Sequence, residues 1–333
     1  MKTSVIAIIV VVIIAVAAVG TYFLLTNNNN NVTDTDYIVR DKAIVGDYIE
    51  MRASITADKV TELTDNTRTL VLYDLYVTAD EMEKIGAQSY TYKGTSIMCD
   101  LYQSANEYRT MTYLIEPSSG VVYRYTSDYG TATTSMSLID SNYDLSKTMA
   151  EQQISVGSYV KYTADSEIKT ENTSVVSTGS TTYTVSAVIP ADDEDYLYNL
   201  TMASNSVSTT ETKLVVESIN TDGTLNIKGS SEPMANDDFI AMISYSKYID
   251  KLRSTGVDIT MGDRTVAKSE TAFGDREVTL QNAVMKESGE TSEVVFTFGN
   301  ADVLYTIEAE QDTDMESTQF VEILGSSLIS VKN

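Results

Sequence analysis

The chain has 333 residues, of which 42% are hydrophobic and 21% charged, and its formal net charge at pH 7 is −25. This length suffices for two domains of ordinary size, each with a hydrophobic core. The negative charge, without a cluster of Lys or Arg, argues against binding to nucleic acid or to anionic lipid headgroups. Solubility through self-repulsion explains the charge most simply, and high ambient salt would be a second explanation.

Histidine is absent and Cys99 is the only cysteine. This composition excludes His-based catalytic triads, Cys-His pairs, and zinc sites built from His or several Cys ligands. It also excludes an internal disulfide, so stability must come from buried apolar surface. Cys99 lies in the alternating segment GTSIMCDLY, with Ile97 and Leu101 on its face of the strand. This pattern predicts a packed core thiol rather than a reactive one.

The N-terminus contains an uncharged apolar run that begins at Ser4 and ends at Leu25. About 20 apolar residues in a helix cross the hydrocarbon core of a bilayer, so we predict a transmembrane anchor. The alternative is a cleaved secretory signal, because Lys2 precedes the run and Ala15-Val16-Ala17 resembles a cleavage site. We favour the anchor because the run continues past the usual end of a signal. The basic residue before the run then places the N-terminus in the cytoplasm and the rest outside.

A polar stretch, TNNNNNVTDTD, follows the predicted anchor and is typical of a tether that cannot bury enough surface to fold. Three N-x-[ST] patterns, which accept N-linked glycans in exported proteins, begin at Asn31, Asn172 and Asn199. All three lie on the predicted outer side of the membrane. We therefore expect an extracellular glycoprotein.

Short alternating runs rich in Val, Ile, Tyr and Thr dominate the chain from residue 45 onward, and they predict β-strands. In the first half the predicted strands cover residues 47–54, 69–77, 96–102, 108–116 and 121–127. In the second half they cover residues 158–164, 181–189, 213–219, 224–228, 277–286, 293–299 and 302–310.

Two segments break the alternation and predict helices. Thr78 and Glu81 have the spacing of a capping box, and Gly86 is placed to end a short helix. A second helix is predicted over residues 236–256, with Asn236 as its cap. Its apolar positions form one stripe that we expect to lie on a sheet, namely Met242, Tyr245, Ile249 and Leu252.

Two sequence echoes predict an internal duplication. VGDYIEM, which begins at Val45, resembles VGSYVKY, which begins at Val156. TYLIEPSSGVVYRYT, from Thr112, resembles VVFTFGNADVLYTIE, from Val294, and each reads as strand, tight turn and strand. We expect two copies of one module, the second with an insertion at about residues 165–236. The alternative is convergence, because such starts and hairpins recur in β-rich chains.

Carboxylates are the remaining candidates for chemistry. The run Asp192, Asp193, Glu194 and Asp195 is a candidate calcium site, because hard cations bind carboxylate oxygens. No calcium-loop spacing surrounds it, so a solvated acidic turn is the simpler interpretation. Two facing carboxylates would suit glycoside hydrolysis, but the chain has no Trp as a sugar platform and spacing selects no pair. We predict no catalytic residue, cofactor or metal ligand.

In style the chain resembles uncharacterised membrane-anchored surface proteins of methanogenic archaea. The likeness rests on the anchor, the asparagine tether and the acidic, Tyr- and Thr-rich β modules with V-G-x-Y starts, and it implies no activity. The segment YLIEPSSGVVYRY is similar to a hairpin of lipoprotein-carrier half-barrels, where an acidic-Pro-x-x-Gly turn joins two strands. That resemblance implies a curved sheet with helices across its mouth that binds acyl chains. The second copy of the hairpin lacks the proline.

The sequence thus predicts an α+β protein, mainly antiparallel β, with one N-terminal transmembrane helix and two related sheet-plus-helix modules. The expected parts are an anchor at 1–26, a tether at 27–43, a first module at 44–150 and a second at 151–333. The predicted function is a non-catalytic cell-envelope protein that makes surface contacts, with the membrane and an envelope protein or lipid as partners. The alternatives are a binder of an apolar or lipid ligand between sheet and helix, and an exported carboxylate-dependent hydrolase.

Overall fold

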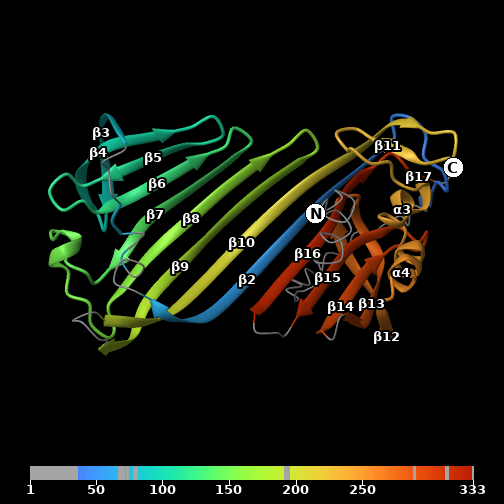
Figure 1. Ribbon diagram of the computed structural model, residues 1–333. Helices are drawn as coiled ribbons and strands as arrows, with labels where there is room; N and C mark the ends of the chain where they lie inside the picture. The colour runs from blue at the N-terminus through green and yellow to red at the C-terminus, as the bar shows by residue number, and fades with distance from the viewer. Residues whose placement is uncertain are drawn as a thin grey trace. The chain divides into compact units, whose positions relative to one another are not determined.

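The computed structural model describes residues 37–66, 72, 75–77, 82–190, 196–287, 290–311 and 315–331. The chain divides into two compact units, and each combines segments that are distant in sequence. Unit 1 comprises Met1–Ala57, Thr170–Ser174 and Thr209–Asn333, and unit 2 comprises Asp58–Lys169 and Val175–Ser208. The described parts of both units are mainly antiparallel β-sheet with few helices, which confirms the β-rich fold (Figure 1).

The predicted anchor and the acidic run at 192–195 lie outside the described residues. Among the helices that are described, none has the length and apolar character needed to cross a membrane. The predicted tether is corrected at its end: β1 (Tyr37–Val39) pairs with β17 (Ile329–Val331), and Tyr37 and Val39 pack against apolar clusters of unit 1.

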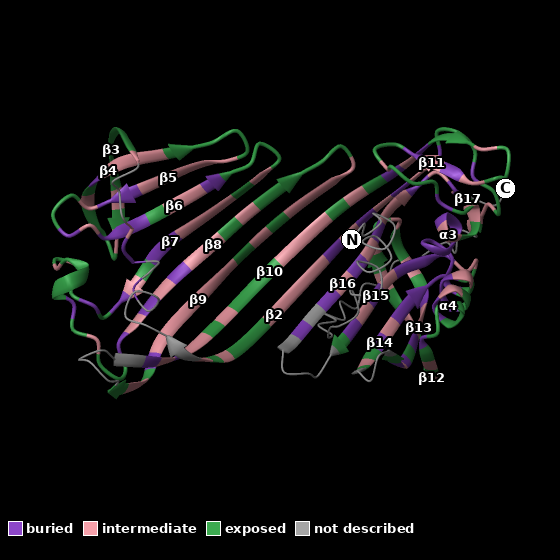
Figure 2. Cartoon of the chain, in the orientation of Figure 1, coloured by how far each residue is buried: buried purple, intermediate pink, exposed green. Residues whose placement is uncertain are grey.

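The sheet of unit 1 is a meander of five strands to which two further strands are added. The hydrogen-bonded order is β12–β13–β14–β15–β16–β2–β10, and β11 pairs with β10. The strands are β12 (Asp258–Thr271), β13 (Gly274–Glu287), β14 (Glu290–Phe298), β15 (Leu304–Gln311), β16 (Met315–Ser326), β2 (Tyr48–Asn66), β10 (Tyr196–Ile219) and β11 (Leu225–Ile227). Residues 58–66 of β2 and 196–208 of β10 belong to unit 2. Buried residues are frequent along β13 to β16, whereas the edge strand β12 is largely exposed (Figure 2).

Helix α4 (Tyr245–Ser254) packs its apolar face on this sheet. Tyr245, Ile249 and Leu252 are buried in one cluster with side chains of β13 to β16. The Tyr245 ring stacks on Phe298 with the ring centroids 3.9 Å apart. The predicted stripe is therefore confirmed for these three residues, whereas Met242 precedes α4 and packs in a second cluster.

The prediction of one continuous helix over residues 236–256 is wrong. Helix α3 (Asn236–Ala241) ends before α4 because the backbone between them joins the sheet. The Leu304 N–H donates to the Ile243 carbonyl at 2.9 Å, and Ser244 forms a bridge with Val303. Asn236 is not the cap either: Ala235 holds the cap position, and the Asn236 side chain accepts a hydrogen bond from the Ala43 N–H at 3.0 Å.

Unit 2 contains a second antiparallel meander, whose first five strands are β3 to β7. The hydrogen-bonded order is β3–β4–β5–β6–β7–β8–β9–β10, with β3 (Glu83–Tyr92), β4 (Thr95–Ala105), β5 (Thr110–Ile115), β6 (Val122–Asp128), β7 (Ala132–Ser141), β8 (Tyr159–Lys169) and β9 (Thr173–Pro190). The short 3₁₀ helix η1 (Met149–Glu151) lies between β7 and β8. The expected module boundary at residue 150 falls inside unit 2, because β7 and β8 pair on either side of it.

Two local predictions in unit 2 need correction. Residues 83–86, expected to end a short helix, belong to β3, where the register shifts between Lys84 and Gly86. The capping-box residues themselves lie outside the described residues. The predicted strand at 69–77 is described only at 72 and 75–77, where Leu72 and Leu75 lie in turns and Tyr76 forms a single bridge with Val121.

Both predicted hairpins are confirmed. In the β5–β6 turn the Glu116 N–H donates to the Val121 carbonyl at 2.9 Å. The Glu116 carboxylate also accepts hydrogen bonds from the Ser118 and Ser119 N–H groups at 2.9 and 2.6 Å. In the β14–β15 turn the Gly299 N–H donates to the Val303 carbonyl at 2.9 Å.

Candidate functional site

A groove of about 530 Å³ opens in unit 1 where β1, the helical segment and the β14–β15 turn meet. It is lined by Tyr37, Ile38, Val39, Asp41, Ile240, Ser244, Ser246, Lys247, Asn300, Ala301 and Asp302. Its floor includes the buried Ile240, and Ile38 on its wall is 46% exposed. The groove therefore combines apolar surface with carboxylates, hydroxyls, an amide and one ammonium group.

Asp302 organises one side of the groove. Its carboxylate accepts hydrogen bonds from the Ser244 hydroxyl at 2.5 Å and from the Ser246 hydroxyl at 2.7 Å. It also accepts a bond from the Ser246 N–H at 2.9 Å, and its carbonyl accepts one from the Tyr245 N–H at 2.9 Å. Asp302 has a positive φ of 63°, so the tight turn before β15 aims this side chain at the start of α4.

The first N–H groups of α4 are thus already bonded, because the Lys247 N–H is capped by the Ser244 hydroxyl as well. The groove is consequently not built to bind an anion at a helix N-terminus. The Ser244 and Ser246 hydroxyls both donate to the Asp302 carboxylate. The groove therefore places hydrogen-bonding groups beside exposed apolar surface.

A second hollow, of about 330 Å³, lies over β12 to β15 and contains three carboxylates. Glu293 and Glu310 are directly opposite each other across β14 and β15, and Glu308 is opposite Val295. Burial raises the pKa of the Glu308 carboxyl above its ordinary value. None of the three forms a salt bridge among the described residues, and no aromatic side chain lines the hollow.

A small cavity lies where Tyr248 of α4 faces side chains of β15 and β16. The cavity there measures about 10 Å³ and is lined by Tyr248, Leu304, Ile307 and other apolar side chains. Such a volume holds about one water molecule. An acyl chain does not fit into this cavity.

The structure describes two of the three predicted glycosylation sites, Asn172 and Asn199. Asn31 lies outside the described residues, and Asn199 is half-buried in β10 of unit 2. Asn172 is in unit 1, between β8 and β9, where its side-chain nitrogen donates to the Lys228 carbonyl. A glycan on Asn172 would compete with this hydrogen bond.

Cys99 is completely buried in the main core of unit 2, as predicted. Burial raises the pKa of its thiol to about 11, with smaller contributions from Glu116 and Asp100. The thiol is therefore protonated and unreactive at neutral pH.

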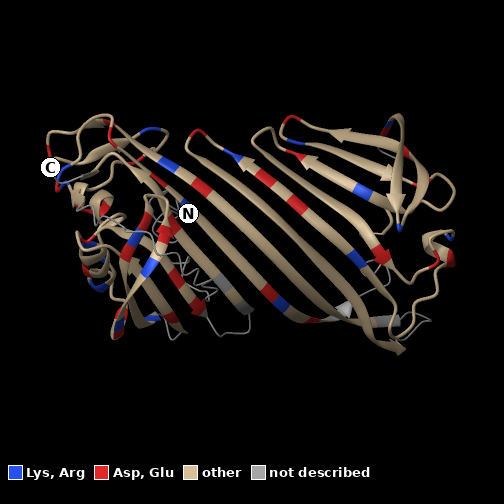
Figure 3. Cartoon of the chain, turned by 180° about the vertical axis from the view of Figure 1, so that it is seen from behind, with Lys and Arg blue, Asp and Glu red and all other residues tan. Residues whose placement is uncertain are grey.

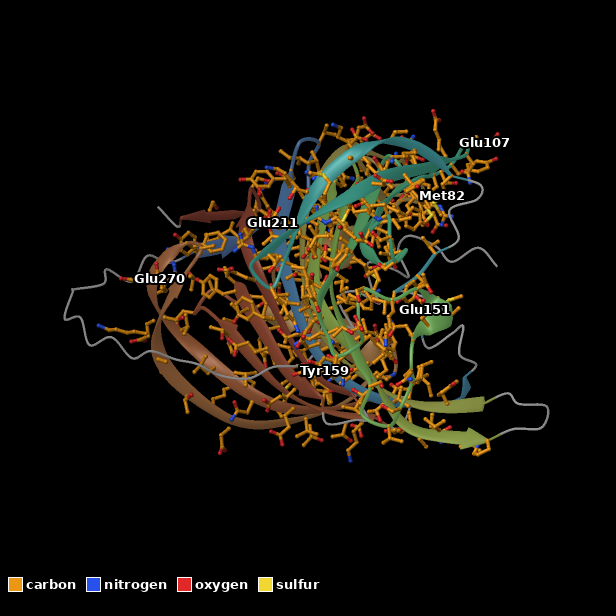
Figure 4. The ribbon with its side chains drawn as sticks, turned by 90° about the vertical axis from the view of Figure 1, so that its left-hand side faces the viewer. Met82, Glu107, Glu151, Tyr159, Glu211 and Glu270 are labelled. Atoms are coloured by element: carbon orange, nitrogen blue, oxygen red, sulfur yellow. The ribbon has the colours of Figure 1, made fainter. Side chains whose placement is uncertain are left out.

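Metal-ligand clusters of three or more His, Cys, Asp or Glu do not occur within the described ranges. Acidic side chains are spread over strands and turns and interleaved with Lys and Arg (Figure 3). Exposed acids such as Glu107 and Glu151 lie at the periphery of unit 2 (Figure 4). Sequence reasoning did not select Asp302 or Glu308. The turn sequence Gly299-Asn300-Ala301-Asp302 could have indicated Asp302. The alternation of apolar and polar residues in β15 does not distinguish Glu308 from other acidic residues.

No protein-family model matches the chain, and no curated protein matches it in sequence.

Proposed function

We propose that the chain is a membrane-anchored, extracytoplasmic and non-catalytic envelope protein whose folded units make contacts at the cell surface. The uncharged run from Ser4 to Leu25 supports the anchor, and the net charge of −25 suits a solvent-exposed ectodomain. The contact site proposed here is the groove lined by Ile38 and Lys247, and its occupant is a polypeptide segment of an envelope protein.

One contrast within unit 1 carries this proposal. The cavity beside Tyr248 of α4 has a volume of about 10 Å³, whereas the groove beside β1 is open and has a volume of about 530 Å³. A contact module needs a packed core and an accessible patch, whereas a lipid carrier needs an apolar cavity of several hundred Å³. The lipid-binding alternative is thus the less well supported of the two.

The hydrolase alternative has one observation in its favour, the raised pKa of Glu308 beside Glu310 and Glu293. Its hollow lacks the aromatic surface on which sugar rings stack, and the facing pair is not distinguished from other acidic pairs. We therefore rank an exported enzyme third.

Photo-crosslinking in intact cells tests the contact site. A photoreactive amino acid at Ile38, on the groove wall, is expected to give one discrete adduct with an envelope protein. The matched control is Val266 in β12 of the same unit, which is 68% exposed and does not line the groove. The proposal is contradicted if both positions give the same adducts, or if Ile38 gives none.

Native mass spectrometry of the purified ectodomain separates the first two functions. We expect the mass of the polypeptide and its glycans alone. A retained lipid of defined mass would favour the carrier alternative.

A further inference from the structure

The two units share one spatial order of strands. In unit 1 the five-stranded meander β12 to β16 is followed across the sheet by β2 and β10, and in unit 2 the meander β3 to β7 is followed by β8 and β9. The strand beside each meander is the one that starts with V-G-x-Y, because β2 begins at Tyr48 and β8 begins at Tyr159. This correspondence does not depend on the contact function proposed above.

The turns before these two strands are built from the same hydrogen bonds. Gly46 and Gly157 have φ angles of +90° and +84°. The N–H of the residue after each glycine donates back across the turn, from Asp47 to the Ile44 carbonyl at 3.0 Å and from Ser158 to the Ser155 carbonyl at 2.9 Å. The side chains of Asp47 and Ser158 then accept the N–H at the start of the turn, at 2.7 and 3.1 Å.

Each turn also joins the neighbouring strand in the same way. The Gly46 N–H donates to the Val216 carbonyl in β10, and the Gly157 N–H donates to the Val185 carbonyl in β9, both at 2.8 Å. The return bonds run from the same valines, from the Val216 N–H to the Asp47 carbonyl and from the Val185 N–H to the Ser158 carbonyl, again both at 2.8 Å.

The two units also share a backbone hydrogen bond that joins the segment before the meander to a strand within it. The segment before β12 meets the strand after the β14–β15 turn, where the Leu304 N–H donates to the Ile243 carbonyl at 2.9 Å. The segment before β3 meets the strand after the β5–β6 turn, where the Val122 N–H donates to the Leu75 carbonyl at 2.9 Å. An isolated bridge flanks each bond, Ser244 with Val303 and Tyr76 with Val121.

We infer that the two units are copies of one module, and that unit 2 is inserted in circularly permuted form between β2 and the part of β10 that belongs to unit 1. In unit 1 the V-G-x-Y strand precedes the meander in the chain. In unit 2 the meander comes first and the V-G-x-Y strand follows it. In each unit, the edge of the last meander strand (β16 or β7) therefore pairs with a strand that begins with V-G-x-Y (β2 or β8).

This inference explains why a boundary at residue 150 fails. Such a boundary separates β8 from the meander that it completes, and it assigns β2 to the wrong meander. Convergence would have to reproduce the same donors and acceptors at the turn, at the neighbouring strand and before the meander, whereas descent from one module requires only a single change of connectivity.

Hydrogen exchange on the full chain tests the nesting. Phe296→Ala removes a fully buried ring from the core of unit 1, and Leu114→Ala truncates a buried side chain in unit 2. We expect F296A to accelerate exchange roughly a hundredfold in β12 to β16 and in residues 48–57 of β2, and to leave β4 to β7 unchanged. L114A should do the reverse. Asp250→Ala, on the exposed face of α4, is the control.

The inference is overturned if F296A leaves residues 48–57 protected, or if β2 responds to L114A together with β4 to β7. Equal acceleration everywhere in both variants would also overturn it, because it would show one cooperative body. If F296A does not fold, Phe296→Leu provides the same comparison with a smaller loss of volume.

Discussion

At the residue scale, two glycines hold backbone angles that other residues rarely adopt. Gly46 and Gly157 have strongly positive φ, and an added Cβ would meet nothing within 4 Å at either position. Backbone strain, and not crowding, is therefore the reason for glycine at these turns. The two V-G motifs predicted a duplication from the sequence. In the structure each motif forms a turn whose glycine has a positive φ.

Replacing Gly157 by Ala should destabilise the protein by about 1–2 kcal/mol, the cost of a left-handed conformation for an L-residue. Gly86 is the matched control, because it also has open space around it and lacks a positive φ. Gly86→Ala should stay within about 0.5 kcal/mol of wild type. Urea denaturation followed by circular dichroism measures both, and equal losses for the two variants would refute the strain argument.

The buried Glu308 carboxyl should make the stability of the protein depend on pH. Its pKa is raised by burial, so the folded state holds a proton more tightly than the unfolded state does. The ionised carboxylate therefore costs stability above the folded pKa, and this cost fades as the pH falls below the unfolded value near 4.3. Glu308→Gln should raise the free energy of unfolding at pH 7, and the gain should vanish near pH 3.

The control for this series is Glu293→Gln, which removes a charge from the same hollow at an exposed position. It should give a smaller gain at pH 7. Denaturation midpoints between pH 3 and pH 8 test the pair. A gain for E308Q that persists unchanged at pH 3 would exclude the proposed origin in ionisation.

At the scale of single elements, alternation located most strands of both meanders, because one face of each is buried. It missed β3, β7, β12 and β16. For β3 and β12 the reason is physical, since these strands start their meanders and are largely exposed. The break between α3 and α4 was also invisible, because it depends on a tertiary bond from Leu304 to Ile243.

Helix α4 should owe its stability to the sheet. Ile249 and Leu252 are 4% and 2% exposed, and truncating either to Ala should cost about 2–5 kcal/mol. Asp250→Ala, between them on the solvent side, should cost less than about 0.5 kcal/mol. Thermal and urea denaturation provide the comparison. Similar losses for Asp250 and Ile249 would mean that the helix is not held by its apolar face.

At the scale of the whole molecule, the sequence predicted the β-rich class and the paired hairpins, because hydrophobic period and turn residues are local. It did not predict the composition of the units. Unit 1 combines the beginning and the end of the described chain, and unit 2 lies between them in sequence. Which strand completes which meander is decided by long-range pairing, and no local pattern near Tyr48 or Tyr159 carries that information. The groove likewise depends on β1, which the sequence suggested to be part of a tether.

The central proposal is that an N-terminal anchor holds both units outside the cell. Cysteine labelling of intact cells with a membrane-impermeant maleimide tests it directly, and the native thiol serves as the internal control. Val45 in unit 1 and Val156 in unit 2 are 61% and 64% exposed, whereas Cys99 is fully buried. Val45→Cys and Val156→Cys should both be labelled in the membrane fraction of intact cells, while wild type reacts only after denaturation. Labelling of either variant only after lysis would contradict the proposal.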